Sequence, residues 1–421
     1  MVPAQRLLDI PPYPFREIAQ LKAKAIAEGQ DLVDWGIGDP DQPTPDHIVE
    51  AYQKEIWNAE WHRYDETGYG DMAFREAIAY HGRQRFGIEV DPKTEIQVAA
   101  GTKDSLALIN WAFVNPGDIV LVPDPGYAVY KVNASFAGGT PYPTPLLPEN
   151  GYLPDLSAIP AEVARQAKLL FLNYPQNPTT AVASHEFFQE AVRWALDNGV
   201  VICHDAAYIE IAYEGYRPVS ILEVEDAKRC CIEFHSFSKT YNMTGWRLGW
   251  SWGHPEIITA LSKMKSNVDN GVFLALQRAG AAALRGPQRC VDELCRMYQR
   301  RRDLLVGGLN SLGWRLEKPK ATFYVWAPCP KGFSSAESGP ASTDREAGRG
   351  RGREAESSES LSSALARALL VECGVLVIPG AVYGAHGEGF FRMSLTIEAD
   401  DPEAKIKEGI QRMRDNLELE F

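Results

Sequence analysis

Short apolar runs recur along the middle of the chain, from about residue 45 to residue 325, and segments with helical periodicity separate them. Most of these runs are apolar at every position rather than at alternate positions, which is typical of strands that are buried on both faces. Such strands, alternating with helices, predict a mostly parallel sheet covered by helices on both sides. The runs lie at 95–100, 118–123, 168–173, 199–205, 231–237 and 249–253.

The two ends of the chain have different patterns. Residues 1–35 predict an extended, proline-containing arm, then a helix over 15–29 that ends at Gly29, and then a short strand that runs into a glycine-rich turn. After this come the central strands and helices. A long helix is predicted from Cys290 to about Leu312, followed by strands in TFYVWAP and GVLVIPG.

These patterns predict two domains and an insertion. We expect the arm and part of a smaller domain in 1–45, a large domain in 46–290, and the rest of the small domain in 291–421. Residues 331–360 contain no Val, Ile, Leu, Met, Trp or Tyr, so they cannot bury enough apolar surface to offset the entropy of ordering. We therefore predict a disordered surface insertion, whose RGRGR run fits a solvated loop better than an acidic partner's binding site.

Composition narrows the classes of protein. Of the 421 residues, 45% are hydrophobic and 24% charged, which fits a globular protein with a large core. The net charge of -13 argues against nucleic acid as the main partner, because phosphate binding needs a basic surface. No apolar run is long enough to cross a membrane and no signal core opens the chain, so we expect a cytoplasmic location. The seven cysteines lack metal-ligand spacing and predict reduced thiols, with no metal site.

The segment SFSKTYNMTGWRLGW contains the strongest chemical signal. Lys239 stands among small and hydroxyl residues, and Arg247 follows eight residues later. A lysine amine can form a Schiff base with the aldehyde of pyridoxal phosphate. The hydroxyls of Ser236 and Ser238 and the guanidinium of Arg247 can grip the phosphate. The segment predicts a pyridoxal-phosphate site, and the alternative is a surface lysine beside a core arginine.

Two further segments offer groups for the same cofactor. Gly101, Thr102 and Lys103 follow a predicted strand and open a helix, whose N-terminal amides form an anion site. Tyr127, after another strand, is placed to stack on the pyridine ring. Each segment alone has an ordinary alternative, a strand-to-helix turn and a loop aromatic.

Polar residues after two more strands complete the pattern. Asn177, in a segment with two X-Pro bonds, and Tyr208 are placed to bond the cofactor's phenolic oxygen. Asp205 ends an apolar run, where open α/β sheets bind ligands. Facing the pyridine nitrogen, its carboxylate would keep that nitrogen protonated and the ring a strong electron sink. Taken alone, Asp205 also fits a helix N-cap.

These motifs resemble, in order, those of the class I/II aminotransferases of pyridoxal-phosphate fold type I. The matching segments span residues 10 to 415: DWGIGDPDQPTP, GTKDSL, PGYAVY, NYPQNPT, HDAAY, SFSKTYNMTGWRLGW and VLVIPGAVYGAHGEGFFRMSL. The resemblance implies an enzyme that moves an amino group between an amino acid and a 2-oxo acid such as 2-oxoglutarate. It also implies a seven-stranded large domain, a smaller α+β domain built from both ends of the chain, and a homodimer.

The resemblance implies a role for each site residue. The catalytic residues are Lys239, which bonds the cofactor and moves the proton, Asp205 and Tyr208. The cofactor-binding residues are Gly101, Thr102, Lys103, Tyr127, Asn177, Asp205, Tyr208, Ser236, Ser238, Lys239, Arg247 and, reaching across from the partner subunit, Tyr64. The substrate-binding residues are Gly38, Asn177 and Arg392. The stretch YDETGYG is slightly longer than the family usually shows, so Tyr69 is an alternative to Tyr64.

The substrate is less sharply predicted than the chemistry. The opening segment PPYPFREIAQLKAKAIAEGQDLVDWGIGDPDQPTP resembles LL-diaminopimelate aminotransferases and their aspartate and alanine relatives, which implies LL-diaminopimelate as the amino donor. Aspartate, alanine or aromatic aminotransferases are alternatives, because small changes in a pocket set the substrate. A carbon–sulfur β-lyase would use the same residues, and a non-catalytic cofactor-binding sensor is a further alternative.

Overall fold

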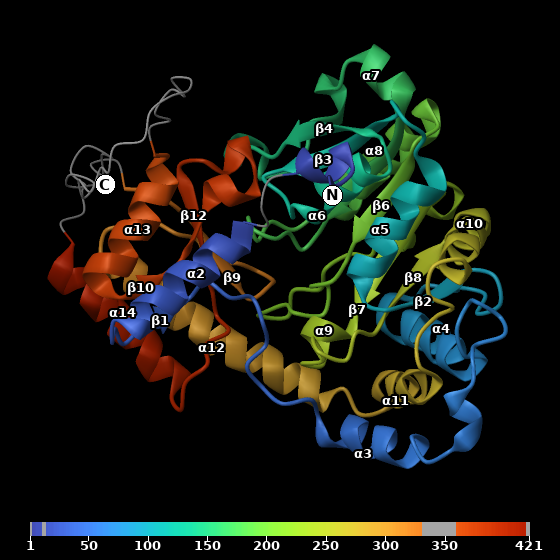
Figure 1. Ribbon diagram of the computed structural model, residues 1–421, viewed down its shortest axis with the longest axis horizontal. Coiled ribbons are helices and arrows are strands. Elements are labelled where there is room, and N and C mark those ends of the chain that lie inside the picture. Colours follow the sequence, from blue (N-terminus) through green and yellow to red (C-terminus); the bar gives the residue numbers. More distant parts are fainter. Residues whose placement is uncertain (1, 11–13, 331–358, 418–421) are drawn as a thin grey trace.

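The computed structural model describes residues 2–10, 14–330 and 359–417, and Figure 1 shows them arranged in two parts side by side. The larger part contains a broad sheet with helices around it, and the smaller part contains the blue helix α2 (Pro14–Ala27) and the red C-terminal helices. The N-terminal residues near Arg6 lie against the larger part. The insertion predicted at 331–360 lies outside the described residues, apart from its last two positions.

A seven-stranded sheet forms the centre of the larger part (Figure 1). Its strand order is β2-β8-β7-β6-β5-β3-β4. Strand β8 is antiparallel to both of its neighbours, and the other adjacent pairs are parallel. The strands are β2 (Ile96–Ala99), β3 (Ile119–Asp124), β4 (Thr140–Pro145), β5 (Ala167–Asn173), β6 (Val201–Asp205), β7 (Cys231–Ser236) and β8 (Gly249–Gly253). The predicted fold class is therefore confirmed.

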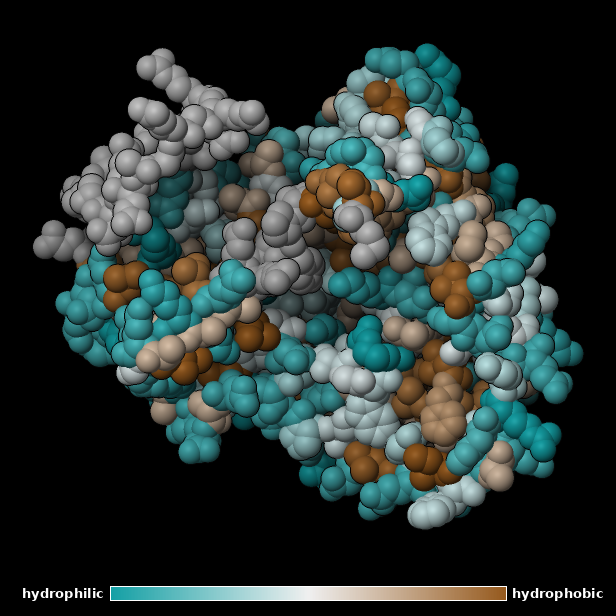
Figure 2. Space-filling view, viewed as in Figure 1, coloured by the Kyte–Doolittle hydropathy of each residue, from teal (hydrophilic) through white to brown (hydrophobic). Residues whose placement is uncertain are grey.

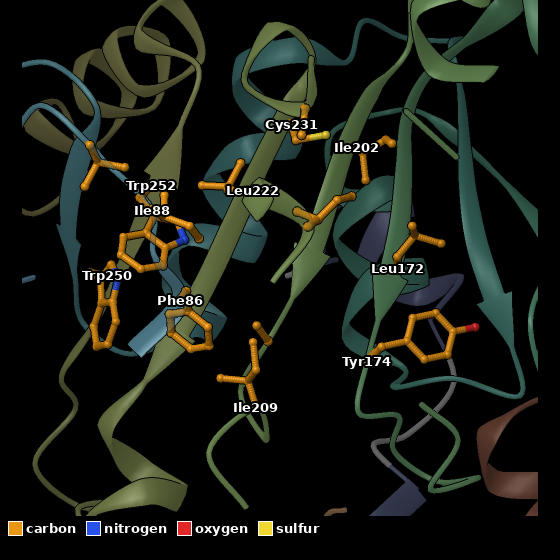
Figure 3. Close-up of a cluster of buried hydrophobic side chains, with 14 of the residues drawn as sticks. Phe86, Ile88, Leu172, Tyr174, Ile202, Ile209, Leu222, Cys231, Trp250 and Trp252 are labelled. Carbon is orange, nitrogen blue, oxygen red and sulfur yellow. The ribbon is translucent and has the colours of Figure 1, made fainter. Parts of the chain in front are cut away.

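Helices cover both faces of this sheet because its strands are apolar on both faces. In β5, Leu170 and Leu172 pack into one core, while Leu169 and Phe171 pack into the other. The first core also contains residues of α3 (Asp46–Glu55), α4 (Met72–Phe86), α8 (His185–Asn198) and α11 (Leu274–Arg285). Figure 3 shows part of it, where Trp252 of β8 lies beside Phe86. The second core contains residues of α5 (Thr102–Phe113), α6 (Val129–Phe136) and α10 (Pro255–Ser266).

Two short helices join elements of the large sheet. Helix α7 (Ala161–Gln166) leads into β5, and α9 (Phe237–Thr240) follows β7 directly. The second of these places Lys239 immediately beyond the end of a central strand.

The smaller part combines the two ends of the chain. Strand β1 (Val33–Asp34) pairs in parallel with β10 (Val375–Leu376), and β11 (Ile378–Pro379), β12 (Phe390–Ser394) and β9 (Tyr324–Pro328) form an antiparallel sheet. Its helices are α2 (Pro14–Ala27), α12 (Arg289–Ser311), α13 (Leu361–Cys373) and α14 (Pro402–Asn416). This confirms the smaller α+β unit drawn from both ends of the chain. The domain boundaries at residues 45 and 290 stay predictions.

Helix α12 connects the two parts. Near its start, Val291 belongs to the core of the large sheet, and further along, Leu305 belongs to the core of the smaller part. The long helix predicted from Cys290 to about Leu312 is therefore confirmed, shifted by a single position.

The N-terminal arm differs from the prediction in detail. A short helix, α1 (Gln5–Leu8), interrupts the segment that we expected to be extended, and α2 ends at Ala27, before Gly29. Within the residues that the structure describes, no helix is both long and apolar enough to cross a membrane. On the face shown in Figure 2, hydrophobic residues form separate patches among hydrophilic ones.

Candidate active site

A cavity of about 920 Å³ lies at the carboxyl ends of the central parallel strands, where an open α/β sheet binds ligands. Residues beyond β2, β3, β5, β6 and β7 line it together with residues of the smaller part. Twelve of the predicted site residues are on its wall: Gly38, Thr102, Lys103, Tyr127, Asn177, Asp205, Tyr208, Ser236, Ser238, Lys239, Arg247 and Arg392. Gly101, which is next to Thr102 in the chain, and Tyr64 are not among the lining residues.

Lys239 projects its amine across the cavity. Ser236 caps the short helix that carries it, because the Ser236 side chain accepts a hydrogen bond from the Ser238 amide at 3.1 Å. Lys239 Nζ donates to the carbonyl oxygen of Gly38 at 2.7 Å. Burial, helped by the charges of Arg392 and Arg247 and opposed by Asp39, lowers the pKa of Lys239 to about 8. The amine is thus poised to act as a nucleophile and a proton carrier near neutral pH.

Asp205 is buried at the end of β6. Its carboxylate accepts hydrogen bonds from the Tyr130 hydroxyl at 2.8 Å and from the Ala207 amide at 3.2 Å. Burial raises the pKa of Asp205, while these hydrogen bonds and the nearby histidines His204 and His235 oppose that rise. Asn173 Nδ2 donates to the Asp205 carbonyl oxygen at 2.8 Å and fixes the backbone.

Helix amides and positive side chains form a cup at the start of α5, made by Gly101, Thr102, Lys103 and Arg247. Gly101 is the N-cap residue of α5 and has no side chain, so the first amides of the helix face a ligand unobstructed. A Cβ atom at Gly101 would lie 2.5 Å from Arg247 Nη2, which explains why glycine is needed there. Arg247 itself has a φ of 56° and donates from Nη1 to the Thr244 carbonyl oxygen at 2.8 Å. Desolvation and the charge of Arg247 lower the pKa of Lys103.

The smaller part contributes Arg392, which is buried and fixed on two sides. Its Nη1 donates to Asn177 Oδ1 at 2.8 Å, and its Nη2 donates to the Gly36 carbonyl oxygen at 2.9 Å. The guanidinium carbon lies 4.0 Å from the centre of the Tyr324 ring, so the cation also stacks on an aromatic face. Arg392 is therefore held in a set orientation for an anionic ligand.

Tyr127, Tyr69 and Tyr64 differ in their exposure and in their contacts within the subunit. Tyr127 lies on the cavity wall and packs edge-on against Tyr130, with ring centres 5.9 Å apart. Tyr69 is held within its own subunit, since its hydroxyl donates to Thr259 Oγ1 at 3.3 Å and its ring faces Arg75. Tyr64 is 79% exposed. Of the two candidates for reaching a partner subunit, only Tyr64 projects from the surface.

Sequence reasoning missed several residues of the site. The hydroxyls of Tyr324 and Tyr208 share a hydrogen bond at 3.1 Å. Burial, together with this neighbour, raises the pKa of Tyr208. Tyr130 donates a hydrogen bond to Asp205, and Asp39 and Lys22 are among the residues that line the cavity. The sequence carries one signal for Tyr130, which follows Tyr127 at the spacing of one helical turn.

The residues present fit pyridoxal phosphate. The amides of α5, together with Lys103 and Arg247, suit a phosphate, and the buried carboxylate of Asp205 suits a protonated ring nitrogen. The amine of Lys239 suits an aldehyde. A cavity of about 920 Å³ has room for both this cofactor and an amino acid.

Comparison with known proteins gives a consistent picture. The family model "Aminotransferase class I and II" matches residues 30–413. An LL-diaminopimelate aminotransferase of Desulforudis audaxviator is 49% identical over 98% of this chain and 97% of its own length. The enzyme of the same name from Moorella thermoacetica is 48% identical over 98% of each chain.

The fold is also similar to that of solved structures. Substrate-bound BacF from Bacillus subtilis is 34% identical, with a TM-score of 0.87, over 99% of this chain and 98% of that chain. A Thermus thermophilus aspartate aminotransferase double mutant is 27% identical, with a TM-score of 0.84, over 99% of this chain and the whole of that chain.

Proposed function

The chain belongs to the class I and II aminotransferase family and depends on pyridoxal phosphate, and we propose that it transfers the amino group of LL-diaminopimelate to a 2-oxo acid such as 2-oxoglutarate. The observation that carries the donor is the near-full-length identity of 49% and 48% to two enzymes of that name. Amino acids and 2-oxo acids are the substrates of the family.

Lys239 performs the central step in this proposal. When bound, pyridoxal phosphate supplies an aldehyde that takes up the substrate's amino group and a ring that accepts electrons from Cα. Lys239 would hold the cofactor at rest through its amine. Once free, that amine would take up the proton at the substrate Cα as a general base and give it back as a general acid. Its lowered pKa, about 8, supports this role because the neutral amine is needed.

The other residues fix the cofactor around that step. Asp205 would pair with the ring nitrogen and keep it protonated, Asn177 and Tyr208 would hydrogen-bond the phenolic oxygen, and Tyr127 would stack on the ring. The residues that would hold the phosphate lie at the start of α5 and around Lys239: Gly101, Thr102, Lys103, Ser236, Ser238 and Arg247.

Arg392 binds the substrate's α-carboxylate, together with the backbone at Gly38. Its bonds to Asn177 and Gly36 set its orientation before the substrate arrives, which reduces the entropy lost on binding. A bidentate pair with a carboxylate needs the planar guanidinium, so lysine is a poor substitute.

The far end of LL-diaminopimelate carries a second ammonium and a second carboxylate. Such a donor needs polar partners at the cavity mouth, since unpaired charges there would cost binding energy. The cavity wall includes a cationic and an acidic side chain beyond those already assigned: Lys22 of α2, whose Nζ lies 2.7 Å from Asp34 Oδ2, and Asp39. This supports a donor that is charged at both ends.

A panel of amino donors with 2-oxoglutarate tests the proposal. We expect LL-diaminopimelate to yield glutamate, and the Lys239→Ala variant to yield almost none. Efficient transfer from alanine, aspartate or an aromatic amino acid, with none from LL-diaminopimelate, would replace the donor. Turnover without any 2-oxo acid would indicate a β-lyase, and cofactor binding without turnover would indicate a sensor.

We also propose a cytoplasmic homodimer that has no nucleic-acid partner and no membrane attachment. The net charge of -13 supports the absence of a nucleic-acid partner, and the exposed Tyr64 supports assembly with a second subunit.

A further inference from the structure

Lys265, in α10, is a buried lysine that lies behind the phosphate cup. Its side chain is 1% exposed, and Nζ donates to Asp104 Oδ2 at 2.6 Å and to Asp269 Oδ2 at 2.8 Å. Lysine is almost never fully buried unless it is paired. Burying this ammonium is costly, so its position calls for an explanation beyond packing.

Asp104 connects Lys265 to the turn that forms the cup. Asp104 lies in the first turn of α5, and its Oδ2 also accepts a hydrogen bond from the Ala100 amide at 2.9 Å. The Ala100 carbonyl oxygen in turn accepts a hydrogen bond from Arg247 Nη2 at 3.4 Å. A continuous series of contacts therefore runs from Lys265 through Asp104 and Ala100 to Arg247.

Asp104 also creates an electrostatic conflict. Its carboxylate lies in the same helical turn whose amides are expected to bind a phosphate dianion. A carboxylate and a phosphate in the same turn would repel each other, and more strongly where water is partly excluded because less screening remains. Of the contacts that the structure gives Asp104, the Lys265 ammonium is the one that brings a full positive charge.

We infer that Lys265 is a positioning residue of the cofactor-phosphate site: it neutralises Asp104 and holds the turn at residues 100–102 in shape around Arg247. The inference rests on the proposed use of this cup for pyridoxal phosphate. It assigns Lys265 no contact with cofactor or substrate, since it does not line the cavity.

Cofactor binding by the full-length protein, stripped of cofactor by dialysis, tests the inference. Kd is measured for pyridoxal phosphate and for pyridoxal, which has no phosphate. Lys265→Met should raise the Kd for pyridoxal phosphate about tenfold or more, because it leaves Asp104 uncompensated beside the phosphate. The Kd for pyridoxal should change by less than about twofold, since it brings no phosphate charge.

Three further variants separate charge from packing. Asp104→Asn should bind pyridoxal phosphate at least as tightly as the wild type, because the repulsion is gone and the amide oxygen can still accept from Ala100. The double variant Asp104→Asn with Lys265→Met should recover to within about threefold of the wild type. Asp269→Asn is the matched control. Asp269 is 34% exposed and lies beyond the C-terminal end of α10, so its loss should leave both Kd values unchanged.

The outcomes that overturn the inference are specific. Equal weakening of pyridoxal and pyridoxal phosphate by Lys265→Met would show a general structural role, and a double variant as weak as the single one would exclude charge neutralisation. If Lys265→Met does not fold, Asp104→Asn decides, because its selective loss of pyridoxal-phosphate affinity would contradict the inference. Failure of the wild type to bind pyridoxal phosphate would instead defeat the proposed function.

Discussion

The amine of Lys239 lies where its neutral form is favoured. Burial is the main cause of its pKa of about 8, against 10.5 for an ordinary lysine. Only the neutral amine attacks an aldehyde, so cofactor uptake by the cofactor-free protein should speed up with pH and level off above about pH 8. Stopped-flow absorbance from about pH 6 to about pH 10 measures this rate. A rate that still climbs about tenfold per pH unit at the upper end would contradict the assignment.

Asp205 allows a graded test at the same scale. Asp205→Asn should lower kcat by about a hundredfold or more, because the carbanion exists only along the reaction path. Tyr130→Phe removes one hydrogen bond that lowers the Asp205 pKa, so it should reduce kcat by less. The measurements are kcat, KM and the isotope effect of deuterium at Cα, which should grow as proton removal slows. A change confined to KM would make Asp205 a positioning residue.

Some residues of the site were predictable from sequence and others were not. Asp205 and Lys239 each follow an apolar run, and the carboxyl ends of parallel strands meet at one edge of the sheet. The contacts of Tyr130 with Asp205 and of Tyr324 with Tyr208 could not be predicted in this way. Tyr130 meets Asp205 across 75 positions of sequence, and Tyr324 meets Tyr208 across 116, so only the packing of whole elements brings them together.

At the scale of elements, the segment Gly36–Gly38 forms a strap over the cavity. Each of its three carbonyl oxygens accepts a hydrogen bond from a side chain of another element. The donors are, in order, Arg392 Nη2 at 2.9 Å, Thr396 Oγ1 at 2.6 Å and Lys239 Nζ at 2.7 Å. The strap therefore joins the proposed carboxylate-binding arginine to the proposed catalytic lysine through a short stretch of backbone.

Gly38→Ala should disturb this strap. A Cβ atom there would lie 2.0 Å from Tyr324 Oη, so either the strap or the Tyr324 ring must shift. A shift of the strap disturbs its contacts with Arg392 and Lys239, and a shift of the ring disturbs its contacts with Arg392 and Tyr208. We expect kcat/KM to fall about tenfold or more, with a small change in Tm. The control is Gly307→Ala in α12, where a Cβ meets no atom within 4 Å and helix propensity should raise Tm slightly. Equal kcat/KM values for Gly38→Ala and the wild type would contradict the role of the strap.

Two features of the sheets were not predicted from the pattern of apolar runs. The apolar runs predicted six of the seven strands of the large sheet but not β4, whose sequence TPYPTP contains three prolines. Among the residues that the structure describes, strand β4 pairs with β3 alone, and proline is tolerated at such an edge because the open side needs no donor. Similarly, GVLVIPG was expected to form a single strand, but it divides between β10 and β11, which belong to different sheets. The partner strands, which lie far away in sequence, decide this division.

At the scale of the whole molecule, large aromatic side chains are exposed at residues 57, 64 and 273. Trp57 is 88% exposed, Tyr64 79% and Phe273 40%, and the rings of His62 and Phe273 are in edge contact at 5.8 Å. Large aromatic side chains grouped on a surface are typical of an interface with another protein. Because Tyr69 is held within its own subunit, Tyr64 is the residue that we expect to complete the active site of a partner.

Hybrid dimers test this arrangement directly. Tyr64→Ala should weaken cofactor binding and Lys239→Ala should abolish turnover, so each homodimer should be poorly active at limiting cofactor. In a hybrid, one site combines the intact Lys239 of one subunit with the intact Tyr64 of the other. After the two variants are unfolded and refolded together, about a quarter of wild-type activity should return, since half of the dimers carry one complete site. The matched mixture of Tyr69→Phe with Lys239→Ala should show no gain beyond the activity of its Tyr69→Phe subunits. Sedimentation of the wild type as an active monomer, or failure of the hybrid to recover activity, would show that each subunit builds its site alone.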